Sequence, residues 1–136
     1  MDRRIARAHA MKLIYEWEMG GDGGEDTRIE LLGVEPGENE TEYMNGMYDG
    51  VVNNREEIDR QISDHLRGWT IDRLSRVDLA ILRLGVYELM LKETAAGIVI
   101  NEAVELVKKY GSDKDYQFVN GLLGTVARAQ DKPAEE

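Results

Sequence analysis

The chain has 136 residues, of which 42% are hydrophobic and 32% are charged, and its net charge is −10. This length and composition suit one globular domain, spanning residues 1–136, with a core of its own. The chain contains no cysteine, which excludes disulfides, thiol nucleophiles and thiolate metal sites and fits a cytoplasmic location. We expect neither a signal peptide nor a membrane span, because no apolar run is long enough for either.

The acidic net charge alone argues against a nucleic-acid partner, since phosphates attract a basic surface. The distribution of charge changes this conclusion. Residues 1–17 are net basic and carry Arg3, Arg4, Arg7 and Lys12, whereas residues 18–42 are strongly acidic and contain a single arginine. The N-terminal end is therefore predicted to be a local cationic patch on an acidic protein.

The first predicted element is a helix over residues 3–19, in which apolar side chains recur every three or four positions. Gly20 and Gly21 end it. Residues 20–40 are acidic and glycine-rich, which indicates a loop, with a short helix at 27–32 that Gly33 would stop.

A long second helix is predicted from Thr41, a plausible N-cap, to Gly68. Its apolar stripe extends from Met44 to Leu66, and Gly46 and Gly50 weaken it locally.

Ser75 followed by Asp78 forms a capping-box pattern that predicts the start of the next helix. Residues 77–91 are apolar on nearly every side, which is typical of a central, buried helix. Gly85 within it indicates that a neighbouring helix approaches closely.

Two further helices complete the pattern. One covers residues 98–110 and is closed by Gly111, and the last begins after a cap at Ser112 or Asp113 and extends to about Ala129. Residues 130–136 are expected to fray. Because no strand-like alternation persists, the predicted fold is all-α, a compact bundle of about five to seven helices.

Several blocks of sequence carry a family resemblance. They are Arg-Arg-Ile-Ala-Arg at 3–7, Leu-Ile-Tyr-Glu-Trp at 13–17, Ala-Ile-Leu-Arg-Leu-Gly-Val-Tyr-Glu-Leu at 80–89, Ile-Asn-Glu-Ala-Val-Glu-Leu-Val-Lys-Lys-Tyr-Gly at 100–111, and Phe-Val-Asn-Gly-Leu-Leu at 118–123. In this order and spacing they closely resemble the NusB family, over residues of about 3–128. The region 20–40 is the least similar.

The resemblance implies a function as well as a fold. NusB proteins are all-helical, with two helical subdomains, and they are not enzymes. They bind the boxA element of ribosomal RNA leader transcripts together with NusE, a small-subunit ribosomal protein. The complex helps RNA polymerase to read through terminators. This chain is therefore expected to be a transcription antitermination factor whose partners are boxA RNA, NusE and the antitermination complex of RNA polymerase.

The resemblance also implies site residues. The arginine-rich N-terminus of the family corresponds to Arg3, Arg4 and Arg7, and residues used against NusE correspond to Tyr15 and Asp78. The block that begins at Phe118 and includes Asn120 lies near the RNA surface in the family, and Lys114 could add a positive charge there. Ile5 interrupts an arginine run that some members keep unbroken, which would weaken the RNA patch.

The residues themselves leave alternatives open. Arg3, Arg4 and Arg7 share a broad helical face suited to phosphate, although they could be a solvated helix start whose charge opposes the helix dipole. A lone Phe118 is more often a core residue than a base-stacking one, and Asn120 could cap a turn.

The two residues assigned to NusE have structural alternatives as well. Tyr15 lies at helical spacing from Met11 and Ala8 and could pack in the core. Asp78 could simply bond back to the Ser75 amide.

No catalytic or metal site is predicted. His9 and His65 are far apart and have no cysteine or organised carboxylates near them, so no metal ligand set is formed. Glu102 and Glu105 lack a nucleophile or histidine, and the glycines at 20–24 lack the residues that follow a phosphate loop. We expect no cofactor.

Two other functions remain open at this stage. Some ribosomal RNA methyltransferases carry a NusB-like domain, so the chain could be an accessory module of such an enzyme. Alternatively, a homodimer could mask the arginines in a resting state. For the chain alone, the acidic charge predicts weak RNA binding that NusE would make tight and selective.

Overall fold

The computed structural model describes residues 3–21, 38–68 and 70–131, and over these residues the chain is helical with no strand. The α-helices are α1 (Arg3–Glu18), α3 (Glu38–Asn53), α4 (Arg55–Ser63), α5 (Arg76–Leu91), α6 (Ala96–Tyr110) and α7 (Tyr116–Asp131), and the two short 3-10 turns are η1 (Ile71–Arg73) and η2 (Asp113–Asp115). The predicted all-α bundle is confirmed. The predicted helix at 27–32 and the tail from 132 lie outside the described residues.

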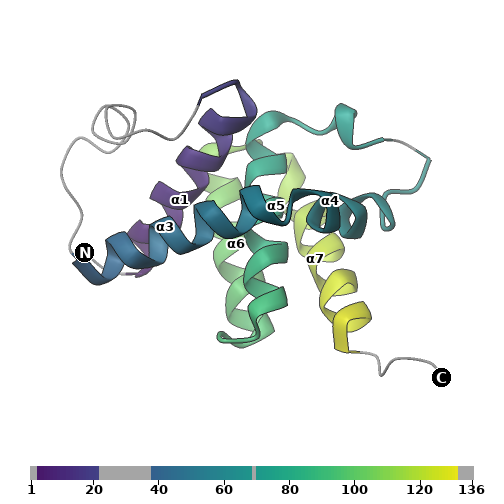
Figure 1. The fold of residues 1–136 in the computed structure, drawn as a ribbon. Helices are drawn as coiled ribbons and strands as arrows, with labels where there is room; N and C mark the ends of the chain where they lie inside the picture. The colour runs from purple at the N-terminus through teal and green to yellow at the C-terminus, as the bar shows by residue number, and fades with distance from the viewer. Residues whose placement is uncertain (1–2, 22–37, 69, 132–136) are drawn as a thin grey trace.

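Helix α5 is the centre of the bundle. Every residue from Asp78 to Val86 on it is buried, as the apolar pattern predicted. The pair α1 and α3 and the pair α6 and α7 each pack against it, and α4 packs against it as well (Figure 1). The two helix pairs agree with the two helical groups that the resemblance implies.

Close approach of the helices depends on small residues at two contacts with α5. A Cβ atom on Gly85 would lie 3.0 Å from Leu123 Cδ1, so α7 is the neighbour that the glycine of α5 admits. On α3, a Cβ atom on Gly50 would collide with the ring of Tyr87. Gly50, which was predicted to weaken the second helix, is thus a residue that allows α3 and α5 to pack closely.

The predicted long helix is wrong in two respects, because it is divided at Asn54 into α3 and α4 and because it ends at Ser63 instead of at Gly68. The Asn54 backbone departs from helical geometry, with φ −116° and ψ 21°. Its side-chain amide donates to the Gly50 carbonyl at 2.8 Å, the acceptor also used by its backbone N–H. An asparagine side chain that competes for a helix carbonyl favours such a break. Val51 and Ile58 remain fully buried on either side, so the apolar stripe continues across it.

Helix ends were predicted to within a few residues. The Ser75 hydroxyl accepts the Asp78 N–H at 3.0 Å, which confirms the cap of α5. Helix α3 begins three residues before the predicted Thr41. Ser112 accepts the Lys114 N–H at 3.3 Å and caps η2 instead of the last α-helix, which begins at Tyr116. None of the described helices is long and apolar enough to cross a bilayer.

An ion network fastens α5 to two other helices. The fully buried Arg83 guanidinium donates to Asp59 of α4 at 2.9 and 3.0 Å and to Glu18 of α1 at 3.1 Å. Because buried charges are tolerated only when paired, these carboxylates fix where α1 and α4 lie on α5.

Candidate RNA-binding and partner-binding surface

The first turn of α1 presents two exposed arginines. The guanidinium of Arg3 lies 4.1 Å from the centre of the Tyr43 ring on α3. Arg4, whose side chain is 70% exposed, donates from Nε and Nη2 to Glu102 of α6, both at 3.1 Å. These contacts orient the two side chains while leaving part of each guanidinium accessible to an anion.

Arg7 has a different environment. It is 7% exposed, and its Nε and Nη2 donate to the two carboxylate oxygens of Glu88 on α5, at 2.8 and 3.1 Å. The Tyr43 hydroxyl donates to the same carboxylate at 2.6 Å. Burial opposes the charged guanidinium, but the Glu88 carboxylate outweighs it and raises the pKa of Arg7. Burial beside Glu88 also raises the pKa of Tyr43.

The predicted common face of the three arginines is therefore wrong. The buried side of α1 includes Ala6, Ala10 and Ile14, and Arg7 lies on that side. Ile5, which interrupts the arginine run, is 45% exposed. Arg7 joins α1, α3 and α5, whereas Arg3 and Arg4 remain available at the surface. Glu88 and Tyr43, which hold Arg7, were not identified from the sequence because they are distant from it along the chain.

The residues assigned near the RNA surface lie on η2 and the start of α7. Lys114 and Asn120 are exposed, and Phe118 is half-buried and packs against the core. Phe118 and Asn120 are two positions apart on one helix and so do not share a face. The structure therefore places only Lys114 and Asn120 openly on the surface.

Asn120 lines a groove between α6 and α7, together with Asn101, Lys108 and Tyr116. The Lys108 ammonium lies 4.9 Å from the centre of the Tyr116 ring. A cation, two amides and an aromatic ring are the groups that proteins use against phosphates and unpaired bases.

The residues assigned to a protein partner differ in exposure. Tyr15 is half-buried against the core, which leaves part of its surface accessible. Asp78 is only 3% exposed, and its Oδ1 atom has no hydrogen-bond partner among the described residues. It lies at the start of α5, beside Gly111 and facing Asp115 of η2.

The Asp78 environment favours its neutral form. Burial and the neighbouring Asp115 raise the pKa of Asp78 to about 7, against a weaker opposing effect of Ser75. A carboxyl buried to this degree is not an open contact for a partner.

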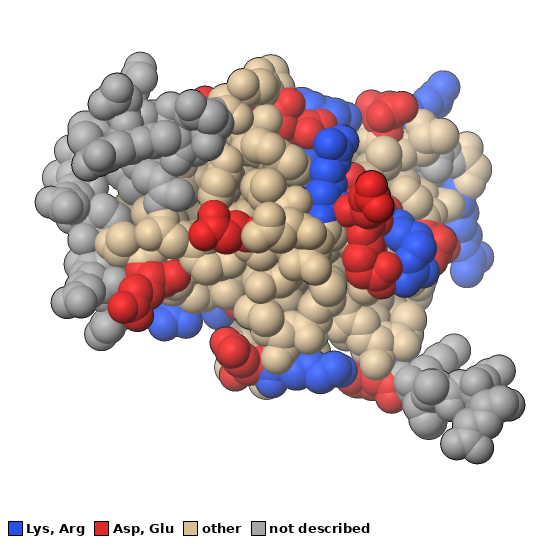
Figure 2. Space-filling model, viewed as in Figure 1, with Lys and Arg blue, Asp and Glu red and all other residues tan. Residues whose placement is uncertain are grey.

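Charges of both signs are mixed elsewhere on the molecule. On the face shown in Figure 2, acidic and basic side chains lie side by side and form no continuous basic surface. Arg60 of α4, for example, pairs with Glu57 of the same helix and with Asp64, the residue that follows it. The described residues include no group of three or more acidic or histidine side chains that could hold a metal ion.

These features define an all-helical bundle that carries a small cationic region on an acidic domain. A family model described as the NusB family matches residues 4–128. The chain is 42% identical over 132 residues to the transcription antitermination protein NusB of Acetivibrio thermocellus, covering 96% of this chain and 91% of the relative. It is 36% identical to that of Halalkalibacterium halodurans over the full length of both. The chain belongs to the NusB family.

Solved structures agree with this assignment. A structure of the antitermination factors NusB and NusE in complex with double-stranded RNA contains a chain that is 38% identical, with a TM-score of 0.83, covering 93% of this chain and 96% of that one. The solution structure of NusB from Aquifex aeolicus matches with a TM-score of 0.81 and 38% identity over the whole of this chain and 96% of that one.

The buried position of Arg7 predicts an effect on stability. Arg7→Gln leaves the Glu88 carboxylate buried without its cation and should lower the free energy of unfolding by about 3–5 kcal/mol. Arg4→Gln removes an exposed pair and should cost less than about 1 kcal/mol. Urea unfolding of both variants measures the difference. An Arg7→Gln protein as stable as the parent would show that the guanidinium does not stabilise the core.

Asp78 predicts a pH dependence of stability. Its folded pKa of about 7 lies above its ordinary value of 3.8, so between these values the folded state holds more protons than the unfolded state. Stability should fall as the pH rises through this window. Asp78→Asn should raise the free energy of unfolding at pH 8 by about 1–2 kcal/mol, which is less than the full difference between the two pKa values corresponds to because solvent screens part of the charge. It should give less advantage at pH 5.

Asp64→Asn, at an exposed position just after α4, is the control and should show no such difference between the two pH values. Thermal unfolding at pH 5 and pH 8 gives the comparison. A loss of stability in the Asp78→Asn protein at pH 8 would mean that the carboxylate is charged and favourably paired.

Proposed function

We propose that this protein is a transcription antitermination factor that binds boxA-type RNA jointly with NusE and promotes read-through by RNA polymerase in ribosomal RNA operons. It acts in the cytoplasm as a non-enzymatic adaptor. The observation that carries the proposal is the likeness in sequence and fold, over nearly the whole chain, to the NusB component of a solved complex with NusE and RNA.

The RNA contacts that we propose follow from exposure and charge. Arg3 and Arg4 supply guanidinium groups, which bind phosphate through two donors and stack on bases. Lys114 adds a cation on η2, and Asn120 adds an amide in the α6–α7 groove. Phe118, half-buried, contributes at most the exposed part of its ring. Arg7 acts indirectly, because it holds the first turns of α1 against α3 and α5.

NusE would supply the positive charge and the base contacts that this chain lacks. With a net charge of −10, the protein repels a polyanion at long range, and phosphate contacts by themselves carry no sequence information. A basic partner beside α1 reduces the repulsion and adds base contacts. Tyr15 is the partner-facing residue that we propose, and Asp78, buried at the start of α5, acts on the partner surface indirectly.

The experiment is a titration of boxA-like and scrambled RNA against the protein alone and against its pair with NusE, at two salt concentrations. The protein alone should bind weakly, and the pair should bind tightly and prefer boxA. Arg3→Gln with Arg4→Gln should weaken binding by the pair at least tenfold. Two lost phosphate contacts should also reduce the salt slope by about 1.4, at roughly 0.7 per contact with single-stranded RNA.

The control is Arg55→Gln with Arg60→Gln, which removes the same charge from α4 and should leave RNA affinity nearly unchanged. NusE binding should survive in both double variants. Tight, boxA-selective binding by the protein alone, or equal losses in the two double variants, would contradict a surface shared between the N-terminus of α1 and NusE.

A further inference from the structure

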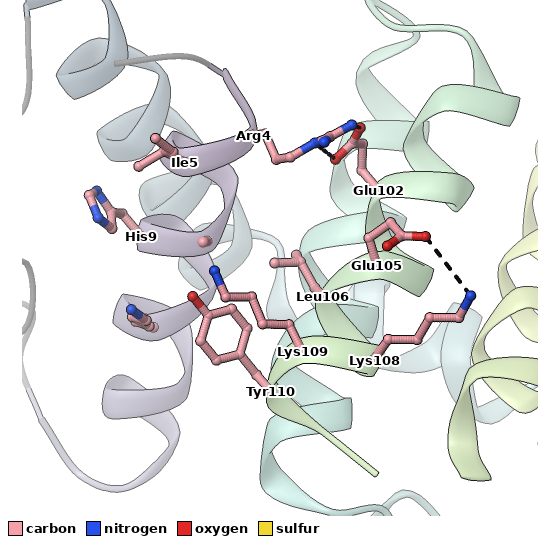
Figure 3. A pocket seen from close by; sticks show the side chains of 11 residues that line it. Arg4, Ile5, His9, Glu102, Glu105, Leu106, Lys108, Lys109 and Tyr110 are labelled. Carbon is pink, nitrogen blue, oxygen red and sulfur yellow. Dashed lines mark hydrogen bonds and ion pairs between the residues drawn. The ribbon is translucent and has the colours of Figure 1, made fainter. Parts of the chain in front are cut away.

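A hollow lies between α1 and α6, next to the arginines but distinct from the α6–α7 groove. It has a volume of about 450 Å³, within the range of roughly 300–1,000 Å³ that is common for ligand sites. Its charged lining comes from both helices and consists of Arg4, Lys12, Glu102, Glu105, Lys108 and Lys109. Figure 3 shows Lys109 and Tyr110 extending from α6 towards α1, with Lys108 on the other side of α6.

The two carboxylates of this hollow are already matched. Glu102 accepts both hydrogen bonds from Arg4, and Glu105 lies 3.9 Å from the Lys108 ammonium (Figure 3). Two cations remain, so the hollow is net positive on a protein whose total charge is −10.

The surplus cations are Lys12 of α1 and Lys109 of α6. Neither has a carboxylate within 4 Å among the described residues. Instead, their ammonium groups lie 5.0 and 5.3 Å from the centre of one aromatic ring, that of Tyr110. Each ammonium is attracted by the ring, but the ring carries no net charge that could neutralise it. The two lysines therefore present positive charge from two helices to an anion.

Lys108 joins this hollow to the α6–α7 groove, because its side chain lines both. Cationic side chains thus extend from Arg4, past Lys12 and Lys109, to Lys108 and the groove that contains Asn120, with the paired Glu102 and Glu105 among them. An RNA backbone, with a charge at every nucleotide, matches such a track better than an isolated anion does.

We propose that the hollow between α1 and α6 is a phosphate-binding subsite, formed by Lys12 and Lys109, for single-stranded RNA that passes from the N-terminus of α1 to the α6–α7 groove. The inference rests on the proposed RNA-binding function and adds to it the path of the strand. An acidic protein segment would meet the same two charges but has no reason to continue across Lys108 to the amides of the groove.

His9 provides a reporter within the molecule. Burial, together with the nearby positive charge of Lys12, lowers the pKa of His9. A phosphate bound at Lys12 offsets that charge and should raise the pKa of His9. The only other histidine, His65, follows α4 and is the internal control.

The test uses the full chain paired with NusE and a boxA-like RNA. Lys12→Gln with Lys109→Gln should weaken RNA binding about tenfold and reduce the salt slope by about 1.4, whereas Arg55→Gln with Arg60→Gln should change little. Affinity for NusE should be unchanged in both. In the unsubstituted protein, NMR titration should show that RNA raises the pKa of His9.

Two results would overturn the subsite. The first is that the Lys12→Gln, Lys109→Gln variant binds RNA as tightly as the parent and that RNA leaves the pKa of His9 unchanged. If the Arg3→Gln, Arg4→Gln variant still loses RNA affinity, the proposed function survives. The other is a loss of NusE affinity instead of RNA affinity, which would make the hollow part of the protein interface. Failure of the unsubstituted pair to bind boxA-like RNA at all would instead reject the proposed function and the subsite with it.

Discussion

Helix α5 is enclosed by its neighbours, so each charge on it must be matched by another helix or remain neutral. This constraint organises the bundle. Glu88 is matched by Arg7 of α1, with a further hydrogen bond from Tyr43 of α3. Arg83 is matched by carboxylates of α1 and α4. Asp78 faces the carboxyl group of Asp115. Burial and that carboxyl raise the pKa of Asp78 and so favour its neutral form.

The match between Arg7 and Glu88 also determines the surface of α1. With Arg7 turned inward, Arg3 and Arg4 in the preceding turn project from the bundle, and Arg4 reaches Glu102 of α6. Helix α1 thus supplies the cation of a buried ion pair and also the first residues of the cationic surface. Within the part of the chain that the structure describes, the protein carries unpaired positive charge where α1 meets α6, and it keeps an acidic balance overall.

The sequence predicted most of what depends on near neighbours in the chain, although the break between α3 and α4 at Asn54 was missed. The apolar pattern of α5 and its Ser75 cap were correct, and Gly85 correctly indicated a close helix contact. Contacts between distant positions could not be predicted. Arg7 and Glu88 are 81 positions apart, so periodicity alone grouped Arg7 with the surface arginines. The cationic hollow was missed for the same reason, because its lysines come from two helices.

We propose that the exposed cations of α1 contact RNA, whereas Arg7 only stabilises the fold. The most direct measurement is an NMR spectrum of the arginine Nε–H groups in the pair with NusE, recorded with and without boxA-like RNA and assigned through single substitutions. We expect the signals of Arg3 and Arg4 to shift on RNA binding. The signal of Arg7 should keep its position and exchange slowly with water. A large RNA-dependent shift of Arg7, with Arg3 and Arg4 unmoved, would contradict the proposal.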